Sequence, residues 1–155
     1  MGVAMYAMTV TRHVQAPRPV VYQALVDPLA IARWRVPDGM VGLVHEFDAR
    51  PGGRLRISLT YVVADGVGKS GERTDTYQGT FVRLVPDVQV IETSEFETED
   101  TGLRGTMTMT TTLTDAGEGT DVTISYEGIP DGVPAHDNEI GTRMALDKLA
   151  RLVET

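Results

Sequence analysis

The chain has 155 residues, 41% of them hydrophobic, with a formal net charge of −8 and no cysteine. This length and apolar content suit one domain with a sizeable core, so we expect a single domain over residues 1–155, with residues 1–7 as a loose lead-in. Binding to a phosphate backbone needs clustered cations, and the acidic balance therefore argues against nucleic acid as a partner. The lack of cysteine excludes disulfides, a thiol nucleophile and thiolate metal ligands.

Two further absences in the sequence narrow the function. There is no run of 18 apolar residues and no basic, apolar signal sequence, so we expect no membrane insertion and a cytoplasmic protein. The three histidines, His13, His45 and His136, show none of the spacings typical of metal motifs. We therefore predict no metal and no cofactor.

The first part of the chain predicts one strand and two short helices. Residues 8–15 (MTVTRHVQ) alternate and are rich in β-branched side chains, which is typical of a strand. Pro19 suits the first turn of a helix that Asp27-Pro28 closes. Residues 29–34 predict a second short helix.

From residue 40 the apolar residues recur with period two, which predicts a run of strands. The predicted strands cover residues 40–49, 55–63, 74–85, 88–97, 104–114 and 120–127. Short connections rich in glycine and proline separate most of them, so consecutive strands should form hairpins in an antiparallel meander. The connection at residues 66–71 (GVGKSG) lacks the G-x-x-x-x-G-K-[ST] spacing, and we reject a phosphate-binding loop there.

Residues 137–154 form the longest segment with helical periodicity. Projected at 100° per residue, one apolar face collects Ala145, Leu146, Leu149, Leu152 and Val153. This stripe predicts a helix that packs on the sheet.

The first half of the same helix departs from that stripe. Ile140 and Met144 project roughly to the other side, so we expect something other than solvent to cover them. Asp137 or Asn138 is the expected N-cap.

Together the elements predict an α+β fold in the order β-α-α-β6-α. A seven-stranded antiparallel sheet needs its apolar face covered, and only the C-terminal helix is long enough to do so.

Four stretches carry a family resemblance. They are VYQALVDP at residues 21–28, ARW at 32–34, HEFDARPGGR at 45–54 and ALDKLARL at 145–152. In this order they resemble the AHSA1-like branch (activator of Hsp90 ATPase homologue 1-like) of the START-like, or SRPBCC, superfamily. The resemblance implies a helix-grip (START/Bet v 1-like) fold, in which a curved antiparallel sheet wraps around a long C-terminal helix.

The resemblance leaves the activity open, because the superfamily includes lipid and small-molecule binders, polyketide cyclase-like enzymes and co-chaperones. One position departs from the pattern: many AHSA1-like proteins carry Gly-Trp early in the last helix, whereas this chain has Gly141-Thr142. Threonine in place of an indole should leave room beside Met144.

A strongly curved sheet around one helix cannot close tightly at both ends, and such gaps tend to become apolar cavities. Three methionines among the expected walls would suit an adaptable lining. The alternative is that these side chains are ordinary core. The candidate wall residues are Trp34, Leu55, Ile57, Leu59, Tyr61, Tyr77, Phe81, Phe96, Met107, Met109, Ile140 and Met144.

His45 is the one weak catalytic candidate. It alternates with Val41, Leu43 and Phe47, so it could point inward and bind a ligand or act as a base. The alternative is a buried structural histidine paired with a carbonyl or a tyrosine. No residue is assigned as catalytic.

The acidic run over residues 92–100 has a simpler interpretation. Its carboxylates, Glu92 among them, predict a solvated face that aids solubility, with a surface for a basic partner as the alternative.

Three functions follow from these observations. The first is non-catalytic binding of a small apolar, aromatic or lipid-like molecule between the sheet and the C-terminal helix, by a monomer or a homodimer. The second is a cyclase or dehydratase that uses His45 with Tyr61 or Tyr77. The third is co-chaperone action on Hsp90, which the resemblance suggests by name alone.

Overall fold

A computed structural model describes residues 5–62 and 74–154. The elements are β1 (Met5–Val14), α1 (Arg18–Val26), α2 (Pro28–Trp34), β2 (Met40–Phe47), β3 (Arg54–Tyr61), β4 (Thr74–Val85), β5 (Gln89–Phe96), the 3₁₀ turn η1 (Thr101–Leu103), β6 (Met107–Ala116), β7 (Gly119–Pro130) and α3 (Ala135–Val153). Seven strands form one antiparallel sheet in the order β1-β7-β6-β5-β4-β3-β2. The predicted α+β class, strand number and helix-grip arrangement are confirmed.

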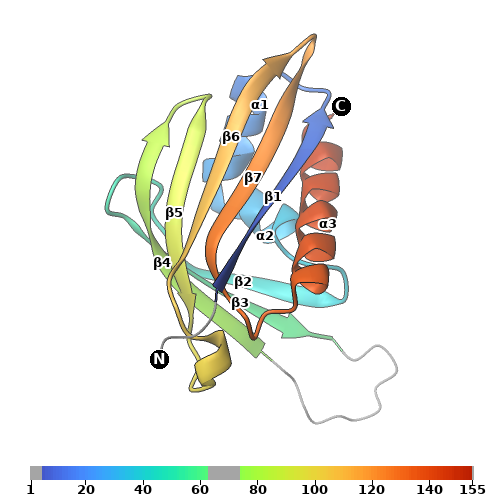
Figure 1. Ribbon diagram of the computed structural model, residues 1–155. Coiled ribbons are helices and arrows are strands. Elements are labelled where there is room, and N and C mark those ends of the chain that lie inside the picture. Colours follow the sequence, from blue (N-terminus) through green and yellow to red (C-terminus); the bar gives the residue numbers. More distant parts are fainter. Residues whose placement is uncertain (1–4, 63–73, 155) are drawn as a thin grey trace.

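The sheet bends strongly, and the helices lie within the bend (Figure 1). α3 runs beside β1, and α1 contacts β6 and β7. The three helices also contact one another, so together they cover the concave face. None of the helices in the described part of the chain is long and apolar enough to cross a membrane.

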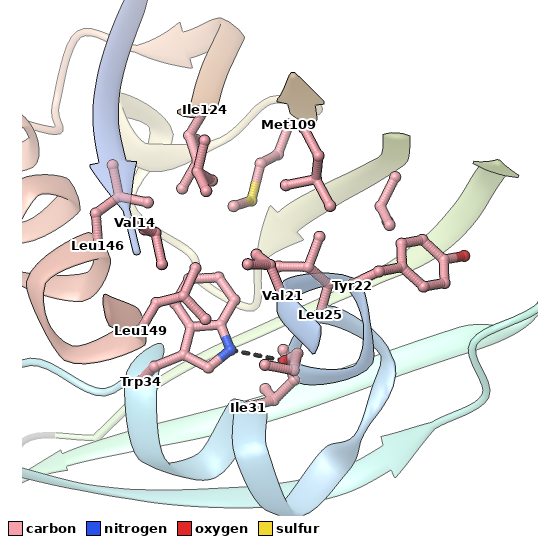
Figure 2. Packing of buried hydrophobic residues seen from close by; sticks show 14 of the residues in the cluster. Val14, Val21, Tyr22, Leu25, Ile31, Trp34, Met109, Ile124, Leu146 and Leu149 are labelled. Atoms are coloured by element: carbon pink, nitrogen blue, oxygen red, sulfur yellow. Dashed lines mark hydrogen bonds between the residues drawn. The ribbon is translucent and has the colours of Figure 1, made fainter. Parts of the chain in front are cut away.

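The core lies where α2 and α3 meet the sheet. Trp34 is 2% exposed, and Figure 2 shows its indole beside Leu149 of α3 and close to Ile31 of α2. The indole N–H donates to the carbonyl oxygen of Ala24 at 2.8 Å, which satisfies the one polar atom of this large side chain.

Strand periodicity positions the inner face of the sheet. In β6 every second side chain from Met107 to Leu113 is buried, as the alternation of a half-buried strand requires. In β2, Gly42 lies against the segment that follows α2. A Cβ at position 42 would lie 2.4 Å from Cγ2 of Val36. Only glycine allows the segment after α2 to pass so closely over this strand.

Several predicted boundaries change. β1 begins at Met5, so the predicted loose lead-in is wrong for residues 5–7; residues 1–4 lie outside the described part, as does the loop at residues 66–71. β6 begins at Met107 rather than at residue 104, because η1 and a short extended segment come first.

The start of α3 also differs from the prediction. The helix begins at Ala135, and Pro134 occupies the N-cap position without a side-chain hydrogen bond. Asp137 therefore sits in the first turn, where a negative charge faces the positive end of the helix dipole, instead of capping the helix.

The expectation that something other than solvent covers Ile140 is wrong. Ile140 is 46% exposed. Met144 is half-buried, and its sulfur accepts a hydrogen bond from the backbone N–H of Asp38 at 3.2 Å. The inward stripe continues instead through Thr142, Leu146 and Leu149, which are spaced four and three residues apart.

This assignment of the α3 faces predicts different effects of truncation on the two sides. Leu149→Ala should lower the free energy of unfolding by about 2–5 kcal/mol, because it leaves a cavity in a close-packed core. Ile140→Ala, on the exposed side of the same helix, should change it by less than about 0.5 kcal/mol. Urea unfolding of both variants measures these changes. A decrease in the free energy of unfolding for Ile140→Ala as large as that for Leu149→Ala would contradict the assignment of Leu149 to the buried face and Ile140 to the exposed face.

Candidate functional site

A cavity of about 300 Å³ lies between the concave face of the sheet and the first half of α3. Its walls come from the end of α2, the following segment, five strands and α3. The lining residues are Trp34, Arg35, Pro37, Leu59, Tyr77, Ser94, Phe96, Met107, Met109, Ile124, Tyr126, Val133, Asp137, Asn138, Gly141, Thr142 and Ala145.

The cavity exists because α3 presents short side chains at this level. Asn138, Gly141, Thr142 and Ala145 are spaced by three or four residues and so share one side of the helix. None of them is a large apolar residue, and a Cβ at Gly141 would meet no atom within 4 Å. Thr142 is 5% exposed, and its hydroxyl donates to the carbonyl oxygen of Asn138 at 2.8 Å. The small residue at position 142 thus borders the open space.

Half of the predicted wall residues line the cavity. These are Trp34, Leu59, Tyr77, Phe96, Met107 and Met109. Leu55, Ile57 and Phe81 are instead at most 1% exposed and belong to the closed core. They share the inner face of the sheet but pack beyond the open space, so the alternative interpretation as ordinary core is correct for them.

The remaining predicted wall residues lie away from the cavity. Tyr61 is the last residue of β3 and is 46% exposed. Ile140 faces solvent, and Met144 contacts the segment before β2. Placement of these three in the wall was wrong, because sheet curvature and the rotation of α3 decide which positions converge.

The expectation that His45 points inward is also wrong. Val41 and Leu43, with which it alternates, are 58% and 59% exposed, so the shared face is the outer one. A bulge in the β2–β3 pairing between Val44 and Glu46 then brings Phe47 back to the inner side. His45 itself is exposed, with its Nε2 2.8 Å from the Ser58 hydroxyl.

A buried ion pair lies beside the cavity. Arg35, directly after α2, places Nη2 2.8 Å from Oε1 of Glu92 on β5 and donates from Nη1 to Oε2 at 3.1 Å. The two side chains are 11% and 5% exposed. Oε1 of Glu92 has no partner of hydrogen-bond geometry within the described residues, so the pair is only partly satisfied. The guanidinium carbon lies 5.8 Å from the ring centroid of Tyr77, within range of a cation–π contact.

This placement contradicts the predicted solvated face for Glu92. The missed signal was strand alternation, because Val90, Glu92, Ser94 and Phe96 fall on one side of β5. Glu97 does lie on the outer side, where both of its oxygens accept from Arg56, at 2.7 and 2.9 Å.

Burial changes the titration of the cavity groups. Burial by itself would lower the pKa of Arg35, but the Glu92 carboxylate outweighs it and raises the pKa, so the guanidinium stays charged. Burial raises the pKa of Tyr77, and it raises the pKa of Tyr126 to about 12. Both phenols therefore keep their protons at neutral pH.

Two side chains, Tyr6 and Lys148, hold the segments around the cavity mouth. Tyr6 donates its hydroxyl proton to the carbonyl oxygen of Val133 at 2.7 Å, which ties β1 to the loop before α3. Lys148 of α3 donates to the carbonyl oxygen of Val36 and lies 3.0 Å from Asp38. Asp137 lines the cavity and is exposed, so the cavity reaches the surface at the first turn of α3.

Metal-binding groups do not gather around this site. Across residues 5–62 and 74–154, no three histidine, aspartate or glutamate side chains lie close enough together to hold a metal ion.

The family described as "Activator of Hsp90 ATPase homolog 1-like protein" matches residues 15–154. The chain belongs to this AHSA1-like family. The predicted family resemblance is confirmed, and the fold agrees with membership of the family. No curated protein is similar to the chain.

Solved structures of similar proteins share the whole fold. Protein CV1439 from Chromobacterium violaceum is 33% identical, with a TM-score of 0.85 over 97% of this chain and 99% of that one. The Mll3558 protein from Rhizobium loti is 27% identical, with a TM-score of 0.71 over 97% and 99%. Protein Ms6760 from Mycobacterium smegmatis is 20% identical, with a TM-score of 0.72 over 96% and 91%, a likeness that shows the fold alone.

The buried pair predicts a non-additive effect on stability. Arg35→Met should lower the free energy of unfolding by about 3–5 kcal/mol, because it leaves the Glu92 carboxylate buried without its countercharge. The double variant Arg35→Met/Glu92→Met should recover most of that loss, since apolar side chains can replace a buried pair. Denaturant unfolding of the two variants and the wild type measures the difference.

The Arg56–Glu97 ion pair on the outer face of the sheet supplies the control. Arg56→Met should change the free energy of unfolding much less than Arg35→Met does, because the side chains of Arg56 and Glu97 are 37% and 30% exposed to solvent. Two outcomes would contradict the burial described for Arg35 and Glu92. One is an equal decrease in the free energy of unfolding for Arg35→Met and Arg56→Met, and the other is a double variant no more stable than Arg35→Met.

Proposed function

We propose that this AHSA1-like domain binds a small apolar or aromatic molecule in the cavity between the sheet and the first half of α3. The observation that carries the proposal is a largely apolar cavity of about 300 Å³ in which a few polar groups converge. Cavities of about 300–1,000 Å³ with this composition are typical of small-molecule sites, and this one lies at the small end of the range.

The chemistry of the walls supports an aromatic ligand. Trp34, Tyr77 and Phe96 offer ring surfaces, and aromatic pairs gain attraction beyond the area they bury. Met107 and Met109 add unbranched, polarisable side chains that adapt to irregular shapes. A flat ring system one or two rings wide suits these walls.

The enzyme alternative keeps Tyr77 in the cavity but lacks its base there. The cyclase or dehydratase hypothesis required His45 in the cavity, and His45 is exposed on the outer face. Action on Hsp90 stays a prediction that rests on the family name.

Filling the space beside Thr142 should weaken the binding of a neutral apolar probe. We expect wild-type protein to raise the fluorescence of N-phenyl-1-naphthylamine, because the probe leaves water for an apolar site. Thr142→Trp should weaken this binding by about tenfold or more, since the indole occupies the volume that the probe needs. Titration of the probe with each protein measures both affinities.

Ile140→Trp is the matched control, because it adds the same side chain two residues away on the exposed side of α3. It should bind the probe like the wild type. Should Thr142→Trp fail to fold, Ala145→Phe fills the same cavity from one turn further along the helix. Wild-type protein that binds neither this probe nor other small aromatic molecules, or equal weakening by Ile140→Trp, would refute the proposal.

A further inference from the structure

We propose that the cavity is selective for a neutral, ring-containing molecule that presents a hydrogen-bond acceptor such as a carbonyl oxygen to Arg35. This inference rests on the proposed function and names the class of ligand. It follows from the balance of donors and charges around one wall of the cavity.

Arg35 is the cationic side chain in the cavity lining. A guanidinium carries five N–H donors and no acceptor, which is more than one carboxylate can accept. Glu92 takes one contact at Nη1 and one at Nη2, and the Tyr77 side chain also interacts with the guanidinium, so not all five donors are used. The group thus retains donor capacity, and a ligand that meets it must supply an acceptor.

The charge of the pair decides which acceptor fits. Glu92 lies within 3.1 Å of the guanidinium and neutralises it where water is largely excluded. A carboxylate ligand would place a second negative charge against the same cation and close to Glu92, and the two anions would repel. A carbonyl oxygen accepts the hydrogen bond and adds no net charge.

The neighbouring polar groups favour the same ligand class. Tyr77 lies under the guanidinium, and Tyr126 lines the cavity with a hydroxyl that stays protonated well above neutral pH. A protonated phenol can donate to a ligand oxygen. Apolar side chains can often replace a buried pair with no loss of stability, so a role in ligand recognition is compatible with what the pair contributes to the fold.

The test compares three naphthalenes of similar size: 2-acetylnaphthalene, 2-ethylnaphthalene and 2-naphthoate. Competition with N-phenyl-1-naphthylamine gives each affinity. Wild-type protein should bind the ketone about tenfold more tightly than the hydrocarbon, because a hydrogen bond to a charged donor adds to the shared ring contacts. It should bind 2-naphthoate more weakly than the ketone.

Variants of the pair test the cause of the selectivity. In Arg35→Met/Glu92→Met the ratio of ketone to hydrocarbon affinity should fall to about one, since the donor is gone. In Glu92→Gln the preference should shift toward 2-naphthoate, because Arg35 is no longer neutralised. Arg56→Met/Glu97→Met, which removes an outer-face pair of the same residue types, should keep the wild-type ratio.

The outcomes separate this inference from the proposed function. Equal binding of 2-acetylnaphthalene and 2-ethylnaphthalene by the wild type would overturn the acceptor selectivity and leave the cavity as an apolar site. Tightest binding of 2-naphthoate by the wild type would overturn the neutral-ligand assignment. Binding of the probe but of none of the three naphthalenes would overturn this inference and keep the proposed function, whereas binding of neither the probe nor the naphthalenes would refute both proposals. The wild-type ratios decide the matter even if a variant of the pair does not fold.

Discussion

A strongly bent sheet must have its concave face covered, and the side chains of α3 decide how completely that happens. Leu146 and Leu149 reach into the core and exclude water around Trp34. One to two turns earlier the same side of the helix presents Gly141 and Thr142, whose small size leaves open space between the helix and the strands. The helix thus closes the fold at one end and leaves a cavity at the other, and both the stability and the proposed binding depend on this change in side-chain size.

The ion pair beside the cavity costs free energy of desolvation. Two charged groups are taken out of water at Arg35 and Glu92, and their attraction offsets the desolvation only if the geometry is good. One carboxylate oxygen lacks a hydrogen bond within the described residues, so the pair does not reach the full satisfaction expected of a buried network. The same low dielectric strengthens hydrogen bonds from Arg35 and the phenols, and this is the physical basis of the ligand recognition proposed for the pair.

The strands could be predicted from the sequence because alternation depends on local geometry. The correct half of the wall, such as Leu59 and Met109, came from counting positions within strands whose inner face was right. Alternation misleads at β2, where Val41 and Leu43 are apolar but exposed, and where Gly42 takes the inner side under Val36. At Glu92 alternation indicates the inner side correctly, but the charge of the residue favours solvent, and the prediction followed the charge.

The sequence by itself determined the order of the elements, the antiparallel pairing and the membership of the AHSA1-like family, because these depend on periodicity, turn residues and short motifs along the chain. Only the tertiary structure decided which of the inward side chains border open space. Convergence of Arg35 with Glu92, 57 residues apart, depends on the curvature of the sheet and the rotation of the helices packed within it. The sheet curvature and the helix rotation result from the packing of the whole core, and no local segment of the sequence encodes them.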